Sequence, residues 1–266
     1  MRFKAYSTLI NLALLVCVTG CGSDVQGQAQ SDSAKPNILF IFTDDQGWNN
    51  LSVPMDDAIP GSGSDYYQTP NIARIADAGM RFSRAYSAAP MCGPSRSSMH
   101  VGIGAARAVY SDGAAALQAE AMTLGQMMRS AGYATAHFGK WNPGPPDDGL
   151  RFYDASDGPV GNNGGNRNEP ENPKDIFGIT ERAIAFIEQS VSDAQPFYMQ
   201  LSHFAPHMQI AALEETIDKW EEIAPGQVHT NPEYAAMMED LDTGIGMVLD
   251  TIEALGIDDN TYVIFT

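Results

Sequence analysis

Two groups of side chains in this sequence could do chemistry together. Asp44 and Asp45 are adjacent carboxylates, and such oxygen ligands suit a hard cation such as Ca²⁺ or Mg²⁺. Cys92 is followed at close spacing by Arg96, in the order Cys-Gly-Pro-Ser-Arg. A thiol is a potential nucleophile, and a guanidinium binds anionic oxygens. Each group also has an ordinary explanation, namely a solvated turn for the carboxylates, a buried inert thiol and a helix-surface arginine.

The elements that must position these groups are visible as alternating patterns. Apolar runs typical of buried strands lie at residues 37–43, 134–138, 196–202 and 262–266. Helical patterns lie between them, at residues 71–78, 124–131, 176–189 and 232–255. The last pattern carries a stripe that predicts a core-facing helix: Met237, Met238, Leu241, Ile245, Val248, Leu249 and Ile252. This alternation predicts an α/β fold with a mostly parallel sheet sandwiched by helices.

Polar side chains follow several of the predicted strands. Asp44 and Asp45 follow the first run, and Lys140 and Asn142 follow the second. His207 comes after the third run. Because ligands of parallel sheets bind beyond the carboxyl ends of the strands, we expect these groups to meet at one edge.

The first residues carry the pattern of an export signal. Residues 1–20 combine a basic start with an apolar run too short to span a bilayer. They end at Val-Thr-Gly-Cys, which resembles the lipobox of bacterial lipoproteins. This resemblance implies that Cys21 is acylated and anchors an exported protein at the periplasmic membrane face or the cell surface. The alternative is an ordinary secreted protein cleaved near Cys21.

The remaining organisation follows from composition. Small polar residues at 21–34 predict a flexible tether, so the folded domain is expected at 35–266. Residues 142–172 are rich in Gly, Asn and Pro and predict a long surface loop that shapes a substrate entrance. The formal net charge of −18 argues against a nucleic-acid partner and means that an anionic substrate needs a local cation. Cys92 has no disulfide partner in the folded part, so its thiol is either inert or kept for chemistry.

Taken in order, these motifs resemble the type I sulfatases of the alkaline phosphatase superfamily. The matching segments are KPNILFIFTDDQGW, TPNIARIADAGMRFSRAYSAAPMCGPSRSSM, TLGQMMRSAGYATAHFGKW and DNTYVIFT. Cys-x-Pro-Ser-Arg is the most distinctive of them. The resemblance implies an alkaline-phosphatase-like fold, incomplete on its C-terminal side. The chain stops at Thr266, before an Asp-Asn pair and a lysine that the family normally adds. We therefore expect 35–266 to be the N-terminal part of a catalytic domain, with poor metal binding and weak activity as it stands.

The same resemblance implies how Cys92 acts. A formylglycine-generating maturation enzyme that reads Pro94 and Arg96 oxidises the thiol to an aldehyde, which hydrates to a geminal diol. One hydroxyl attacks the sulfate ester and expels the alcohol, and the second then releases sulfate from the covalent adduct. Asp44 and Asp45 bind Ca²⁺, or alternatively Mg²⁺, with an oxygen of the modified Cys92 as a further metal ligand.

Three other positions take roles from the resemblance. Arg96 holds the modified side chain, and Lys140 pairs with the sulfate or the formylglycine oxygens. His207 contacts sulfate and helps to protonate the leaving oxygen. The implied substrate is a sulfated small molecule or glycan. No role is carried onto His100 or His203, which are expected to be structural or exposed.

One departure from the family pattern concerns Asn142, where the family usually has histidine. An amide can orient a hydroxyl but cannot accept its proton at neutral pH, and His137 is not expected to replace it. Besides a sulfuric ester hydrolase, two hypotheses therefore stay open. One is a formylglycine-dependent phosphonate or phosphodiester hydrolase, and the other is a non-catalytic, lipid-anchored binding protein on a sulfatase scaffold.

Overall fold

The predicted strands form one central sheet. The computed structural model describes residues 35–107, 121–142, 152–157 and 168–266. Residues Ala34–Thr266 form one compact unit. Within it the principal strands are β1 (Asn37–Phe42), β2 (Ala134–Gly139), β6 (Phe197–Ser202) and β7 (Thr261–Phe265). Each lies within a residue or two of its predicted run, because continuous apolar runs suit strands covered on both faces.

All pairings in this sheet are parallel, in the order β3-β2-β6-β1-β7, where β3 is Ala155–Ser156. β1 lies between β6 and β7, with Leu39 opposite Met199 on one side and Val263 on the other. The carboxyl ends of β1, β2 and β6 therefore lie at the same edge, as the sequence predicted.

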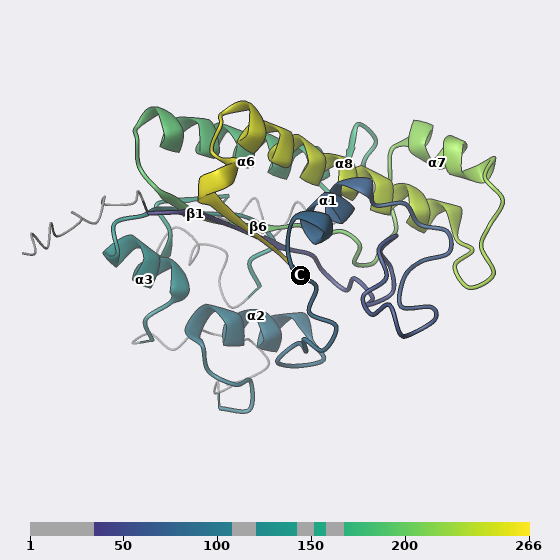
Figure 1. Cartoon of the computed structure of the whole chain (residues 1–266), viewed down its shortest axis with the longest axis horizontal. Helices are drawn as coiled ribbons and strands as arrows, with labels where there is room; N and C mark the ends of the chain where they lie inside the picture. The colour runs from purple at the N-terminus through teal and green to yellow at the C-terminus, as the bar shows by residue number, and fades with distance from the viewer. Residues whose placement is uncertain (1–34, 108–120, 143–151, 158–167) are drawn as a thin grey trace, which may run out of the picture. The chain divides into compact units, whose positions relative to one another are not determined.

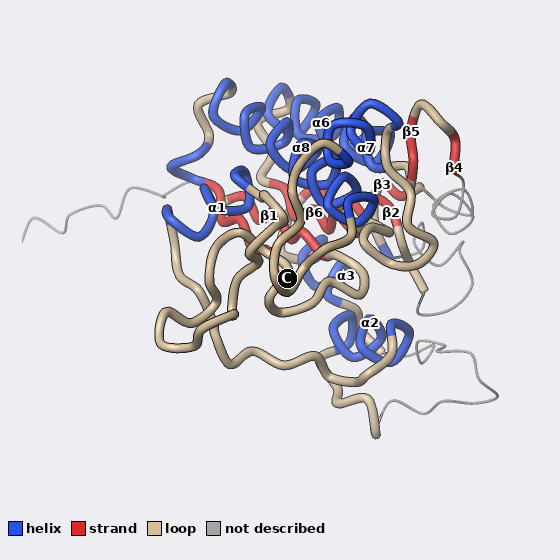
Figure 2. Tube along the Cα trace, turned by 90° about the vertical axis from the view of Figure 1, so that its right-hand side faces the viewer, coloured by secondary structure: helices blue, strands red, loops and turns tan. Residues whose placement is uncertain are grey.

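Helices cover both faces of the sheet (Figures 1 and 2). On one side lie α1 (Pro70–Ala78), α6 (Ile176–Ser192), α7 (Glu214–Glu221) and α8 (Pro232–Ala254). On the other lie α2 (Cys92–Val101) and α3 (Leu124–Ser130). The sandwich predicted from the alternation of strands and helices is confirmed.

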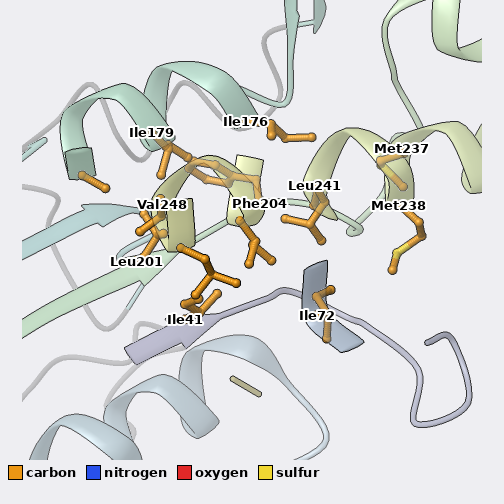
Figure 3. Close-up of a cluster of buried hydrophobic side chains, with 14 of the residues drawn as sticks. Ile41, Ile72, Ile176, Ile179, Leu201, Phe204, Met237, Met238, Leu241 and Val248 are labelled. Atoms are coloured by element: carbon orange, nitrogen blue, oxygen red, sulfur yellow. The ribbon is translucent and has the colours of Figure 1, made fainter. Parts of the chain in front are cut away.

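Two hydrophobic clusters lie on opposite faces because side chains alternate along each strand. Leu39 and Ile41 of β1 belong to the larger cluster, together with residues of α6 and the whole predicted stripe of α8. Figure 3 shows Ile41 in this cluster with Ile179 of α6 and Val248 of α8. Ile38 and Phe40 point the other way, to a smaller cluster around Trp141. The larger cluster also holds Trp220 of α7, which is fully buried. The site residues carried by α2 thus rest on the smaller core.

The predicted surface loop at 142–172 is corrected in part. Phe152 and Tyr153 are each 1% exposed and pack in the smaller cluster with Trp141. The next residues form β3 and extend the sheet beside β2. Farther on, β4 (Asn168–Glu169) pairs with β5 (Asn172–Pro173) as an antiparallel ribbon. Aromatic burial therefore overrides the loop-like composition here. Residues 143–151 and 158–167 lie outside the described residues.

The predicted signal at 1–20 and tether at 21–34 also lie outside the described residues. Across the ranges that the structure describes, no helix has both the length and the apolar character needed to cross a membrane.

Candidate active site

The two predicted metal-binding carboxylates diverge at the carboxyl end of β1. The backbone N–H of Asp44 donates to the carbonyl of Ala205 (3.2 Å), which ties this turn to the segment after β6. The Asp44 side chain is buried, whereas Asp45 adopts a positive φ of 60° and its side chain is 62% exposed. Asp44 therefore points into the protein interior, and Asp45 faces solvent.

Asp44 brings together two of the predicted cations. Lys140 Nζ donates to its Oδ2, and Arg96 Nη2 lies 3.4 Å from its Oδ1. Arg96 Nη1 also donates to the carbonyl oxygen of Lys140 (2.9 Å). These contacts join the ends of β1 and β2 to helix α2, so residues far apart in the sequence form one charged cluster. Hereafter Asp44, Arg96 and Lys140 are called the Asp44 cluster.

Arg96 is not the helix-surface residue of the ordinary explanation. It is 1% exposed, and its guanidinium carbon lies 4.4 Å from the centre of the Phe42 ring, a cation–π contact. Burial lowers the pKa of its guanidinium, and the nearby Asp44 charge opposes that shift. A buried guanidinium keeps its charge and its fork of donors, which suits it to hold oxygens in fixed positions.

Lys140 is positioned by an unusually close approach between two strands. Gly139, the last residue of β2, has φ 93°, and a Cβ there would lie 2.0 Å from the Ser202 carbonyl oxygen. The Lys140 N–H donates to that same oxygen (2.7 Å). On the other side, Gly139 N–H donates to Asp157 Oδ2 (2.6 Å). Only glycine satisfies both the backbone conformation and the space at this point.

Substituting Gly139 by alanine should therefore damage both stability and the site. The added methyl must displace β2 from β6, so we expect a loss of about 3 kcal/mol or more in the free energy of unfolding. Urea denaturation measures this loss, with Gly132→Ala as a matched control. Gly132 also has a positive φ, but the nearest atom to an added Cβ there is the end of the Lys35 side chain at 3.4 Å. Equal losses for both variants would contradict the role given to the strand approach.

Cys92 is the first residue of α2 and is half-buried with a free thiol. The loop before it is held to the helix by Ser95, whose Oγ donates to the Ala89 carbonyl (2.7 Å). Arg96 lies one turn farther along the helix, and the proximity of Cys92 acts to raise the pKa of its guanidinium. The thiol is thus neither sealed in a core nor bound to another cysteine.

His207 meets Asp45 and not the Asp44 cluster. Its Nε2 lies 3.5 Å from Asp45 Oδ2, and its Nδ1 lies 2.6 Å from the Met208 carbonyl oxygen. The imidazole is 37% exposed, so this pair sits at the solvent side of the strand ends. The structure therefore brings the predicted residues together in two groups, the buried Asp44 cluster of three residues and the exposed pair of Asp45 and His207.

Asn142 and His137 take separate positions, as the sequence indicated. Asn142 is half-buried with φ 66°, a left-handed conformation that asparagine tolerates. His137 is 1% exposed, and its ring centre lies 5.0 Å from that of Trp141 and 6.1 Å from that of His100. His137 belongs to the smaller core and cannot supply the proton acceptor that Asn142 lacks.

Burial keeps three histidines neutral. Burial lowers the pKa of His100 and of His203 to about 3, and the charges of Arg96 and Arg182 respectively add to the shift. Burial lowers the pKa of His137 well below its ordinary value. Both His100 and His203 are buried, so exposure is excluded for them and a structural role stays the expectation.

These histidines predict a loss of stability in mild acid. A histidine in the unfolded chain has a pKa of about 6.5. As the pH falls below that value, the unfolded chain binds protons at these histidines and the native state does not. From about pH 7.5 to about pH 6 the free energy of unfolding should fall by about 2 kcal/mol. Burial raises the pKa of Asp240 to about 6, an opposing effect that grows below that pH. Urea denaturation at the two pH values tests this, and His203→Gln should remove about a third of the fall. A flat profile for the unmodified chain would contradict it.

Two buried polar groups near the site were missed by sequence reasoning. Lys174, which lies between β5 and α6, is fully buried, and its Nζ has no hydrogen-bond partner among the described residues. Gln46 follows Asp45 directly, and both of its amide atoms are buried without a partner in the same ranges. Lys174 lies in no recognisable motif, so only the tertiary structure shows it. Gln46 could have been found from the sequence, because it directly follows the two carboxylates.

The donors at the end of β1 fit a hard divalent cation in their chemistry. Asp44 and Asp45 offer carboxylate oxygens, and the orphaned Gln46 amide adds a neutral oxygen, which together match the preference of Ca²⁺ or Mg²⁺. Within the described ranges, no three His, Cys, Asp or Glu side chains gather closely enough to bind a metal ion. Cys92 as a source of a metal ligand therefore stays a prediction.

The sequence profile of the family described as Sulfatase matches residues 36–266 of this chain. The chain belongs to the sulfatase family. A protein named "Sulfatase" from Formosa agariphila is 26% identical, over 99% of this chain and 62% of its own length. The "Ulvan-active sulfatase" of the same organism is 25% identical, over 96% of this chain and 55% of its own length. This sulfatase-family chain thus spans little more than half the length of these curated relatives.

Solved structures agree on the fold. The crystal structure of Ps i-CgsB, in complex with k-i-k-neocarrahexaose, superposes with a TM-score of 0.70 at 22% identity. The match covers 87% of this chain and 58% of that one. At this identity the likeness establishes the fold, so the helix-flanked, mostly parallel and alkaline-phosphatase-like architecture is confirmed for this member of the sulfatase family.

Proposed function

We propose that the protein, at its natural length, hydrolyses sulfate esters by means of a formylglycine made from Cys92 and a bound divalent cation. The observation that carries this proposal is the Asp44 cluster. It joins the aspartate just beyond β1, the arginine of Cys-x-Pro-Ser-Arg and the lysine that follows β2. Membership of the sulfatase family supports the same reaction.

The chain's own residues divide the work. Arg96 is held rigidly by Asp44, by Lys140 and by the Phe42 ring, and so fixes oxygens of the modified side chain one helical turn away. Lys140 offers its ammonium to the sulfate group. His207, half-exposed beside Asp45, would bring a proton to the leaving alcohol, and its exposure on the solvent side supports this role. A formylglycine supplies the two hydroxyls that attack and then release sulfate.

Asp44, Asp45 and Gln46 would hold the cation, whose chemical contribution is to polarise the sulfate oxygens. Calcium is the first choice because oxygen-only donors of mixed charge suit its flexible coordination, and magnesium is the alternative.

A sulfated glycan is the favoured substrate class. The relatives and neighbours include an ulvan-active sulfatase and a structure in complex with a neocarrahexaose, both named for a carbohydrate. We further infer export and anchoring through an acylated Cys21, which would place the protein where such polymers are met, and maturation by a formylglycine-generating enzyme.

The test is a substrate panel on the protein at its natural length, produced together with a formylglycine-generating enzyme and supplied with Ca²⁺. We expect release of sulfate from aryl sulfates or sulfated oligosaccharides to exceed turnover of matched phosphodiesters and phosphonates. The reverse preference would favour a phosphonate or phosphodiester hydrolase. Converted Cys92 without turnover of any ester would favour the non-catalytic binding protein.

A further inference from the structure

Lys174 is the feature near the site that the proposed reaction leaves unused. Its side chain is fully buried, and its Nζ contacts no hydrogen-bond acceptor in the described part of the chain. An ammonium has three donors and no acceptor, and burying it unpaired is strongly unfavourable. If Lys174 only filled space in the interior, an apolar residue of similar length would make the folded protein more stable.

The turn that carries Lys174 is strained and braced. Lys174 and Asp175 both adopt positive φ, at 59° and 53°. Asn172 locks the turn, because its side-chain amide donates to Asp175 Oδ1 (2.8 Å) and its side-chain oxygen accepts from the Phe177 N–H (3.0 Å). Consecutive non-glycine residues in this region persist only where the surroundings fix them, and such strain clusters at functional sites.

The same turn is tied to the strand end that carries Lys140. Arg182 of α6 donates to Asp175 Oδ2 (2.7 Å) and pairs with Asp157 (2.6 Å). Asp157 in turn accepts from the backbone N–H of Gly139, the residue before Lys140. A continuous set of hydrogen bonds and ion pairs therefore holds the Lys174 turn in register with the Asp44 cluster.

The charges agree with this placement. Burial lowers the pKa of Lys174, the Asp44 carboxylate opposes that shift, and the Lys140 charge adds to it. The charges of Asp44 and Lys140 both act on Lys174, which therefore lies within electrostatic reach of the Asp44 cluster, where Arg96 and Lys140 share the one carboxylate of Asp44. Arg96 and Lys140 contact Asp44, and Arg182 contacts Asp157 and Asp175, whereas Lys174 has no carboxylate partner in the described ranges. An anionic ligand would supply that missing partner.

We propose that Lys174 is a second lysine of the substrate site, which donates from Nζ to oxygens of the sulfate group. The inference rests on the proposed function and deepens it, because it adds a sulfate-binding donor that no motif of the sequence marks. A tetrahedral oxyanion offers several acceptors at once, so it can satisfy both Lys140 and Lys174 where the single Asp44 carboxylate cannot.

The test compares Lys174→Met with the unmodified protein at its natural length. Methionine keeps the length of the side chain and removes the charge. Titration calorimetry with inorganic sulfate should show binding weakened roughly tenfold or more, and KM for a sulfate ester should rise accordingly. The melting temperature should stay equal or rise, because a buried unpaired charge has been removed. A merely structural lysine would alter melting without altering sulfate binding.

Lys219→Met is the matched control. Lys219 is an exposed lysine of α7 that pairs with Glu239, and its loss should leave sulfate binding unchanged. If Lys174→Met does not fold, Lys174→Gln serves as the second variant. We expect it to weaken sulfate binding in the same way. Sulfate affinity equal to that of the unmodified protein in a folded Lys174 variant would overturn the role of Lys174.

This failure is distinct from failure of the proposed function. If the unmodified protein is an active sulfatase and the Lys174 variant binds sulfate equally well, only the role of Lys174 is overturned. An unmodified protein that binds sulfate through Lys174 but hydrolyses no sulfate ester would support the binding role and overturn the proposed function.

Discussion

Replacing Cys92 by alanine is expected to abolish sulfate release, with a loss of roughly 10³-fold or more in kcat. The proposed reaction forms its covalent bond through this side chain, and the buried Arg96 one turn along α2 is placed to serve it. Cys92→Ser should be as inactive, because a single hydroxyl could attack sulfur but could not then release the sulfate. Sulfate release from an aryl sulfate measures both variants.

The matched control is Met91→Ala, next to Cys92 at the start of the helix. Met91 is 66% exposed, so its truncation should leave both activity and stability close to those of the unmodified protein. Mass analysis of the peptide that contains Cys92 completes the experiment. Active protein should show a mass lowered by the difference between a thiol and an aldehyde. An unmodified thiol in fully active protein would refute the formylglycine mechanism.

Substituting Asp44 by asparagine is expected to affect stability and metal binding together. The change leaves Arg96 and Lys140 with no buried carboxylate, and breaking a buried pair in this way costs about 3–5 kcal/mol in the free energy of unfolding. Urea denaturation measures this loss. At the protein's natural length, added Ca²⁺ should raise the melting temperature with Asp44 present and leave that of the Asp44→Asn variant unchanged, because a native-state ligand stabilises only where it binds.

Asp57→Asn supplies the comparison. Asp57 pairs with Arg81 (3.1 Å) but its side chain is 73% exposed, and such solvent-exposed ion pairs contribute little to stability. A stability loss in Asp44→Asn no larger than that of Asp57→Asn would show that the Asp44 cluster is not the buried electrostatic centre described above.

The sequence predicted the scaffold well because burial dictates residue type. Continuous apolar runs gave the principal strands, and the stripe of α8 from Met237 to Ile252 is buried as expected. The convergence of Asp44, Arg96 and Lys140 was predictable in outline, since parallel strands end at one edge. These features follow from the local pattern of apolar residues and from the rule that parallel strands end at one edge of a sheet.

What the sequence did not reveal depends on contacts between distant segments. Phe152 and Tyr153 lie in a stretch whose composition indicates a loop, yet they fill space beside Trp141. Lys174 sits in a motif-free turn, and its burial follows from the bracing by Asn172 and Arg182. The division of the carboxylates into a buried Asp44 and an exposed Asp45 follows from one positive φ, which no composition pattern encodes.

The two-faced packing of the sheet also gives the protein an optical readout. Its three tryptophans occupy three surroundings: Trp141 is 2% exposed in the smaller core, Trp220 is fully buried in the larger one, and Trp48 is 42% exposed just beyond the carboxylates. Indole emission shifts to longer wavelength in water, so single-tryptophan variants would report separately on each layer. Trp48 would report on the solvent side of the strand ends, Trp141 on the smaller core beside Lys140, and Trp220 on the larger core.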